Sequence, residues 1–316
     1  MVRLTPERLR PAVLMGLALS LLVVGCAGGA ADHQRDDSGL RPWSGAARFT
    51  ADEQARLHEA VQREVATCMR THRLEYLPQP AADTRREASA SPYGLLTGAT
   101  ARSDGYGIVG EILSGGTEPP PDANAGLLAS MGMDQADRWR GALLGRPEQM
   151  RQITVPDAPV IRYDPDSCAA RGRAEVYGRG WDEALLGAEA ATNRVVDSVR
   201  KDAGYRRAVA EWSNCMADRG YDYPDLQAPR AALARRAERA ETASELTALG
   251  RTEIETASRD WACEREVRLH HAAEQAQRRA EQAELQRDPG LAGRLERFRG
   301  MKQRAVAATA GARAAG

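Results

Sequence analysis

The sequence predicts an all-α fold. Disulfide-clipped helical hairpins are expected to form a small bundle, with long C-terminal helices and an irregular, Pro/Gly-rich middle region. Three observations predict this class. Apolar residues recur at helical spacing over residues 50–73, 169–218 and 230–287. Aromatic residues make up only 5% of the chain and the mean hydropathy is −0.52, which indicates a thin core. Four cysteines beyond residue 26 offer two disulfides that would hold the helices together.

The N-terminal segment is typical of a signal peptide. Arg3, Arg8 and Arg10 precede an apolar run of about fifteen residues, which is too short to span a bilayer core of roughly 30 Å. The run ends in VVGC, which resembles the lipobox of bacterial lipoproteins. This resemblance implies that residues 1–25 are a lipoprotein signal peptide and that Cys26 carries the lipid. The alternative is an ordinary secretory signal in which the cysteine is incidental.

Residues 26–48 are expected to be the lipidated cysteine and a flexible tether, because they are mostly small and polar. Such a tether reaches roughly 25 Å, and two or three acyl chains give stable membrane anchoring. We therefore expect an extracytoplasmic protein that is lipid-anchored to the cell membrane.

Charge argues against one class of partner. The chain carries 44 basic and 44 acidic residues. Without residues 1–25, which hold three arginines and one glutamate, 41 basic residues remain against 43 acidic ones. A near-neutral chain has no electrostatic footprint for nucleic acid, so we expect no nucleic-acid partner.

The first helical unit is expected over residues 49–178. Thr50 and Glu53 have capping-box spacing at the start of its first helix. One face of that helix is apolar and carries Leu57, Val61, Val65 and Cys68. Residues 78–166 are expected to be a long irregular insertion, interrupted by a helix near 134–144, because turn-forming residues are frequent there.

The second helical unit is expected over residues 179–303, and it repeats a pattern of the first. CMRTHRLEY (68–76) and CMADRGYDY (215–223) both place Cys-Met at the start and tyrosine eight residues after the cysteine. Gly220 can supply the left-handed residue that ends the second helix, whereas the first copy has Arg73 there.

Long helices rich in alanine, glutamate and arginine follow Pro229. They are expected over residues 231–250 and 251–288, with a stop at Pro289 and Gly290. Residues 304–316 are expected to be a disordered tail.

With Cys26 used for lipid, three pairings of the remaining cysteines are open. Each Cys-Met copy is followed by one further cysteine on a helical segment, which favours Cys68–Cys168 and Cys215–Cys263. Each disulfide would clip a Cys-Met helix to a later helix and would stabilise the fold by about 4–5 kcal/mol at most. A crossed pairing stays open.

A family resemblance lies in the same segments. WSNCMADRGYDYP and ETASRDWAC resemble the W-x-x-C-M…G-Y and A-x-x-D-x-x-C segments of a group of uncharacterised actinobacterial secreted proteins and lipoproteins. SPYGLLTGATARSDGYG, WRGALLG and SCAARGRAEVYG are similar to that group as well. The resemblance implies a disulfide-bonded helical envelope protein and no particular chemistry. Because Arg73 departs from the pattern, the resemblance supports the Cys215–Cys263 disulfide more than the Cys68–Cys168 disulfide.

Two motifs of enzymes are matched only in part. GYGIVG (105–110) has the letters of G-x-G-x-x-G, but no convincing strand precedes it and no βαβ unit follows. We expect a loop with two permissive turns there and no cofactor. HEAVQ (58–62) has Gln62 where a second zinc ligand belongs, so His58 is expected on a solvated helix face.

The remaining polar residues predict no catalytic or metal site. His270 and His271 are adjacent and project in different directions, and a zinc site from Cys263 and His270 lacks partner ligands. Asp166 and Asp260 are carboxylates that could act as acid or base, but the expected role of both is to cap a helix or to pair with its dipole. The nucleophile motif G-x-S-x-G does not occur. We therefore expect that the protein is not an enzyme.

The sequence favours a non-catalytic cell-envelope lipoprotein on the outer face of the cytoplasmic membrane. It would be a structural or interaction/accessory protein whose partner is an envelope protein or the cell wall. The alternative is an extracytoplasmic small-ligand or glycan/peptidoglycan binder that uses aromatic rings. The candidate binding surface consists of Tyr93, Tyr106, Trp139, Tyr221 and Tyr223. In the interpretation we favour, these rings instead cover the small cores beside the disulfides.

Overall fold

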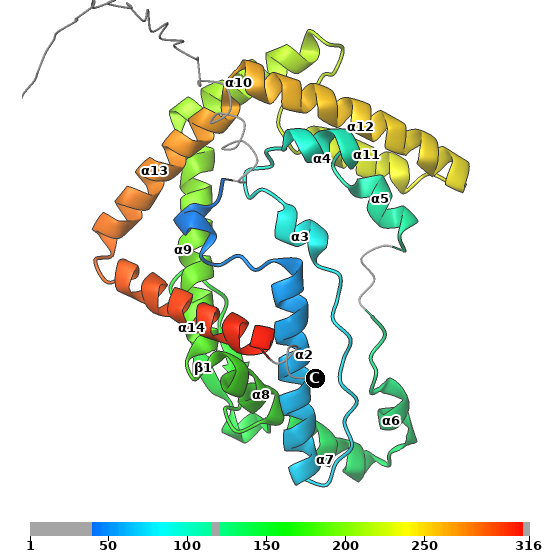
Figure 1. Ribbon diagram of the computed structural model, residues 1–316, viewed down its shortest axis with the longest axis vertical. Coiled ribbons are helices and arrows are strands. Elements are labelled where there is room, and N and C mark those ends of the chain that lie inside the picture. Colours follow the sequence, from blue (N-terminus) through cyan, green and yellow to red (C-terminus); the bar gives the residue numbers. More distant parts are fainter. Residues whose placement is uncertain (1–39, 116–119, 312–316) are drawn as a thin grey trace, which may run out of the picture.

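The computed structural model describes residues 40–115 and 120–311, and the fold is all-helical as predicted (Figure 1). Its α-helices are α2 (Ala51–Thr71), α3 (Arg85–Ser89), α4 (Gly98–Ser103), α5 (Ile108–Leu113), α6 (Ala125–Ser130), α7 (Met133–Leu144), α8 (Cys168–Tyr177), α9 (Trp181–Lys201), α10 (Ala203–Ala217), α11 (Ala228–Ala237), α12 (Ala243–Glu266), α13 (Leu269–Arg287) and α14 (Leu291–Gly311). Two short 3-10 helices are η1 (Pro42–Gly45) and η2 (Pro147–Gln149). Strands β1 (Arg151–Ile153) and β2 (Ile161–Tyr163) pair antiparallel, with Gln152 opposite Arg162.

The helices form two ends joined by a long helix. Figure 1 shows α12 with α4, α5 and α11 at one end, α2 with α7 and α8 at the other, and α9 running between them. Three hydrophobic clusters correspond to this arrangement. The thin core that the low aromatic content predicts is therefore divided into three parts.

The largest cluster joins α9, α10, α13 and α14. Trp181 stacks on Phe298 with ring centroids 5.0 Å apart, and Trp212 is fully buried in the same cluster. Three of the six buried residues of α13 are alanines, whose small side chains let helices approach closely.

A second cluster lies where α4, α5 and α11 pack on α12. Leu96, Val109 and Leu249 are among its buried residues. Contacts therefore cross the predicted boundary at residue 178, because part of the predicted insertion of the first unit packs on a helix of the second.

The third cluster lies between α2, α7 and α8. Thr50 and Glu53 form the predicted capping box of α2, with both of its hydrogen bonds present. On α8, a Cβ atom at Gly172 would come within 2.7 Å of a methyl group of Val65. A glycine at this position thus permits the close packing of α8 on α2. The expected helix over 134–144 is confirmed as α7.

Both predicted flexible ends are corrected in part. The predicted tether extends to residue 48, but Trp43 is 6% exposed within the largest cluster, and its backbone N–H donates to Glu281. The predicted tail begins at residue 304, but α14 continues to Gly311 and Ala305 is 2% exposed. In both cases packing on neighbouring helices holds a segment whose composition predicts disorder.

The signal peptide and Cys26 lie outside the described residues, so both stay predictions. Among the helices of residues 40–115 and 120–311, none is long and apolar enough to cross a bilayer.

Candidate functional site

The structure contains the two disulfides that the repeated pattern favours. Cys68–Cys168 and Cys215–Cys263 have Cα atoms 5.5 Å and 5.8 Å apart. The two Cys-Met helices also end in the same way. The N–H of Leu74 donates to the carbonyl of Met69, and the N–H of Tyr221 donates to the carbonyl of Met216, both at 3.0 Å. Each copy is therefore a helix with a Schellman-type end.

The residue in the C-terminal turn has a different conformational cost in the two copies. Gly220 has φ +86° and Arg73 has φ +58°, so both adopt the left-handed conformation that ends the helix. Glycine adopts it freely, whereas a side chain at this φ is strained by about 1–2 kcal/mol. The first copy thus keeps an arginine at a position where its backbone favours glycine.

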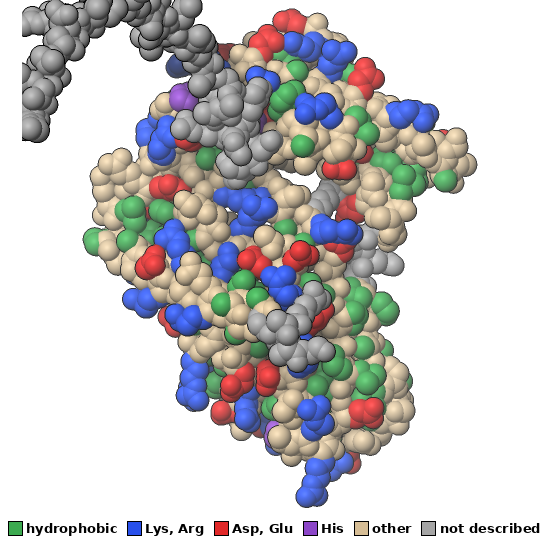
Figure 2. Space-filling model, viewed as in Figure 1, with side chains coloured by type: hydrophobic (Ala, Val, Ile, Leu, Met, Phe, Trp, Pro, Cys, Tyr) green, Lys and Arg blue, Asp and Glu red, His purple; other side chains and the backbone are tan. Residues whose placement is uncertain are grey.

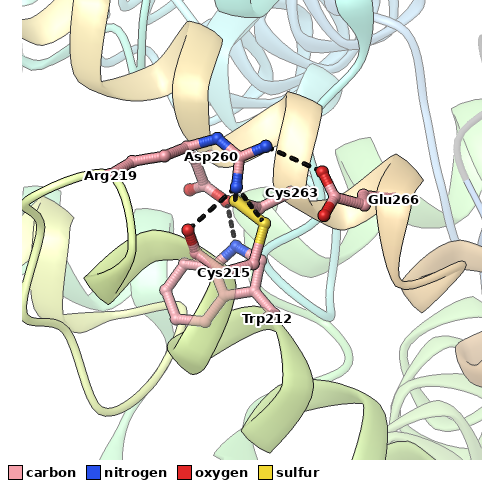
Figure 3. Close-up of a disulfide and its surroundings, with 6 residues drawn as sticks. All are labelled: Trp212, Cys215, Arg219, Asp260, Cys263 and Glu266. Carbon is pink, nitrogen blue, oxygen red and sulfur yellow. Dashed lines mark hydrogen bonds and ion pairs between the residues drawn. A yellow bond between two sulfur atoms is a disulfide. The ribbon is translucent and has the colours of Figure 1, made fainter.

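In both copies a nitrogen-bearing side chain four residues after the cysteine lies against the disulfide. Figure 3 shows Arg219 over the sulfur atoms, with Nη1 2.7 Å from Sγ of Cys215 and 3.2 Å from Sγ of Cys263. Its Nη2 pairs with Glu266 at 2.7 Å. The guanidinium therefore covers this disulfide and joins the two helices by an ion pair.

His72 holds the corresponding position in the first copy. One ring nitrogen of His72 and the sulfur atoms of Cys68 and Cys168 lie within 4.8 Å of one another. Three such atoms resemble a metal-ligand set, but the two sulfur atoms are bonded to each other and are not thiolate ligands. The arrangement is a disulfide with an adjacent imidazole.

Beside the second disulfide lies a buried carboxylate, Asp260, and the helix-start role expected for it is wrong, because it lies well inside α12. Asp260 is completely buried; its Oδ1 accepts from the indole nitrogen of Trp212 at 2.7 Å and its Oδ2 from the hydroxyl of Tyr106 at 2.8 Å. Burial and the nearby charge of Glu264 raise the pKa of Asp260 to about 8. Burial and the neighbouring Asp260 also raise the pKa of Tyr106.

Glu264 belongs to the same buried group on α12. It is fully buried, and its carboxylate accepts from the backbone N–H of Leu96 and bonds the Nε2 atom of His270 at 2.7 Å. His271 instead lies 2.9 Å from the side-chain nitrogen of Gln275, so the two adjacent histidines point in different directions as predicted.

The glycine-rich segment 105–110 binds a carboxylate of the same chain. Backbone N–H groups of Tyr106, Ile108 and Val109, at the start of α5, donate to the carboxylate of Glu253 at 2.7–3.0 Å. Gly105 has φ +64°, and a Cβ atom there would meet Glu253 at 2.6 Å. A glycine loop and a helix N-terminus suit an anion, and here the anion is a side chain of α12.

The candidate aromatic surface is mostly buried. The exposed fractions of Tyr93, Tyr106 and Trp139 are 3%, 8% and 4%, and the three rings lie in three different clusters. Only Tyr221 and Tyr223 come together, half-buried and stacked with centroids 6.2 Å apart. Burial favours the interpretation in which three of the five rings cover cores.

The other candidates also have structural partners. Nε2 of His58 lies 2.8 Å from the carbonyl of Gln79, and Gln62 accepts from the hydroxyl of Tyr76, so HEAVQ fixes the chain after α2. Asp166 is exposed just before α8. Ser167, rather than Asp166, is the N-cap of α8 and accepts from the N–H of Ala170.

A pocket lies beside the first disulfide. It has a volume of about 610 Å³ and is lined by the end of α2, one face of α7 and the loop before α8. Its basic lining residues are His72, Arg73, Arg138 and Arg146. They are spread over 75 residues of sequence, so no local motif could have indicated the pocket.

The arginines of this pocket are not paired. Among the described residues, none of the ion pairs includes Arg73, Arg138 or Arg146, whereas Arg140, also on α7, pairs with Asp137 at 3.2 Å.

The chain matches no known family model, no curated protein and no solved structure.

Proposed function

We propose that the protein is a non-catalytic cell-envelope lipoprotein, held on the outer face of the cytoplasmic membrane through Cys26. In this proposal it is an interaction or accessory protein that contacts another envelope protein. The N-terminal segment supports the location, because it has the charge, length and lipobox of a lipoprotein signal. The buried carboxylates support a scaffold role, since Asp260, Glu253 and Glu264 are all used in internal hydrogen bonds.

Exposed apolar side chains, which we call the apolar edge, are the observation that supports a protein partner. Met133 is 86% exposed at the start of α7, and Ile112 and Leu113 at the end of α5 are 41% and 52% exposed. Leu77, in the chain after α2, is 42% exposed, and α6 has no buried residue. Figure 2 shows apolar side chains at α5 and, further along the same side of the molecule, around α6. Exposed apolar surface of this kind favours a protein partner.

Photo-crosslinking in cells tests this proposal. A photoreactive amino acid replaces Met133 in the full lipidated chain, and a second variant carries it at the exposed Arg297 of α14 as a control. We expect a reproducible membrane-protein adduct, identified by mass spectrometry, from position 133 and none from position 297.

Two outcomes would count against the proposal. Equal, non-specific crosslinking from both positions would show that the apolar edge is not the surface that contacts a partner. Recovery of wall material alone would favour the glycan-binding alternative and direct attention to Tyr221 and Tyr223.

A further inference from the structure

We propose that the pocket beside the Cys68–Cys168 disulfide binds a small molecule through a phosphate or carboxylate group, with Arg73 and Arg138 as its ligands. This site shares no residue with the apolar edge, so either assignment can fail without the other.

The charges of the pocket point to an oxyanion. Arg73, Arg138 and Arg146 line it, and none of them has an ion-pair partner among the residues that the structure describes. By comparison, Arg194, which lies between helices, pairs with Glu284 at 2.8 Å. Guanidinium groups bind carboxylate and phosphate in a bidentate manner, and exposed, unpaired arginines that line one pocket suit such a ligand.

Among the described residues, the two acidic residues of the pocket form no ion pair with its arginines. Asp164 is 3% exposed, and its Oδ1 accepts from the backbone N–H of Asp166 at 2.9 Å, so this carboxylate is committed to the turn before α8. It also lies directly against Gly145, where an added Cβ atom would overlap it. Asp166 is exposed at the rim of the pocket.

The backbone of Arg73 is a second, independent indication. The other copy of the repeat ends its helix with Gly220 in the same left-handed conformation, with the same hydrogen bond to the methionine carbonyl. Arginine at this position costs stability, and strained side chains cluster at functional sites. Arg73 nevertheless occupies this turn, where a glycine would be unstrained, and its side chain lines the pocket.

The size and lining restrict the ligand further. A volume of about 610 Å³ is within the range of small-molecule sites. Leu74 and Ala142 are the apolar side chains of the lining, and the remaining residues are polar or glycine. A small polar molecule with an oxyanion group therefore fits better than an acyl chain or an aromatic drug-like compound.

Isothermal titration calorimetry of the full lipidated protein in non-ionic detergent tests the proposal. The probes are inorganic phosphate and citrate, which separate a phosphate site from a carboxylate site. We expect one of them to bind, and we expect Arg73→Gly and Arg138→Gln each to weaken that binding at least tenfold. Arg140→Gln, on the same helix but paired with Asp137, is the matched control and should change binding less than twofold.

Arg73→Gly also separates loss of binding from loss of folding. Because glycine adopts a positive φ freely, this variant should melt at a higher temperature than the wild type while it binds the anion less tightly. The proposal would be overturned if neither phosphate nor citrate bound to the protein. Equal weakening by Arg140→Gln and Arg138→Gln would also overturn it, because that result indicates general electrostatic attraction.

Discussion

The indole nitrogen of Trp212 donates to Oδ1 of Asp260 at 2.7 Å, and each of these residues stands three positions before a cysteine of the same disulfide. Three positions are nearly one helical turn, so each helix presents its cysteine and its polar partner on one face. Helices α10 and α12 are thus joined twice, by Cys215–Cys263 and by a buried hydrogen bond (Figure 3). The W-x-x-C and D-x-x-C segments are therefore the two halves of one contact.

Trp212→Phe removes one donor from a buried carboxyl group. An unsatisfied buried polar group costs about 1–3 kcal/mol, and we expect the free energy of unfolding to fall by that amount. Urea denaturation followed by circular dichroism measures it. Trp261→Phe is the control, because Trp261 is only partly buried and its ring stacks with Arg102 and Arg265. An equal loss in both variants would contradict the role given to the hydrogen bond.

Asp260 makes stability depend on pH. Its pKa is raised from 3.8 to about 8, so the folded protein keeps a proton that the unfolded chain has released. Between these two pH values unfolding releases that proton, and the contribution of Asp260 to stability falls as the pH rises, by at most about 1.4 kcal/mol per pH unit. Above about pH 8 this contribution becomes constant.

Asp260→Asn tests this dependence, because asparagine keeps an oxygen acceptor for Trp212 and does not titrate. We expect the stability difference between the variant and the wild type to grow in favour of the variant from pH 5 to pH 8. Thermal melts at a series of pH values supply the comparison. A difference that stays constant over this range would show that Asp260 is not protonated in the folded protein.

Helix positions were predictable wherever a local signal exists. The capping box at Thr50 and Glu53 marks the start of α2, and Pro289 with Gly290 marks the stop after α13. The predicted break between the long C-terminal helices at residue 250 is wrong. Helix α12 runs through it and ends near Arg268, whose φ of 55° no local residue type indicates.

Tertiary contacts explain what the sequence could not indicate. The repeated Cys-Met pattern favoured both disulfides, because cysteines are few and their helical segments are recognisable. The acceptor of the glycine loop, Glu253, lies more than 140 residues after the loop. The arginine pocket likewise depends on three distant segments meeting, which composition and periodicity do not encode.

Removal of either disulfide should destabilise the protein strongly. Cys68→Ala with Cys168→Ala, or Cys215→Ala with Cys263→Ala, is expected to lower the free energy of unfolding by about 2–5 kcal/mol, because the thin core leaves much of the stability to the cross-links. Denaturation of each double variant beside the oxidised wild type measures this. A loss below about 1 kcal/mol would mean that packing alone holds the helices.

Gly105 and Gly110 should respond to alanine with opposite signs, although both belong to the same glycine-rich segment. Gly105→Ala forces a side chain to φ +64° and against Glu253, so we expect a loss of about 2 kcal/mol or more in the free energy of unfolding. Gly110 lies inside α5 with no atom within 4 Å of an added Cβ, so Gly110→Ala should stabilise by about 0.5–1 kcal/mol. Urea denaturation of the two variants is the measurement. Unchanged stability in Gly105→Ala would contradict the close contact between this loop and Glu253.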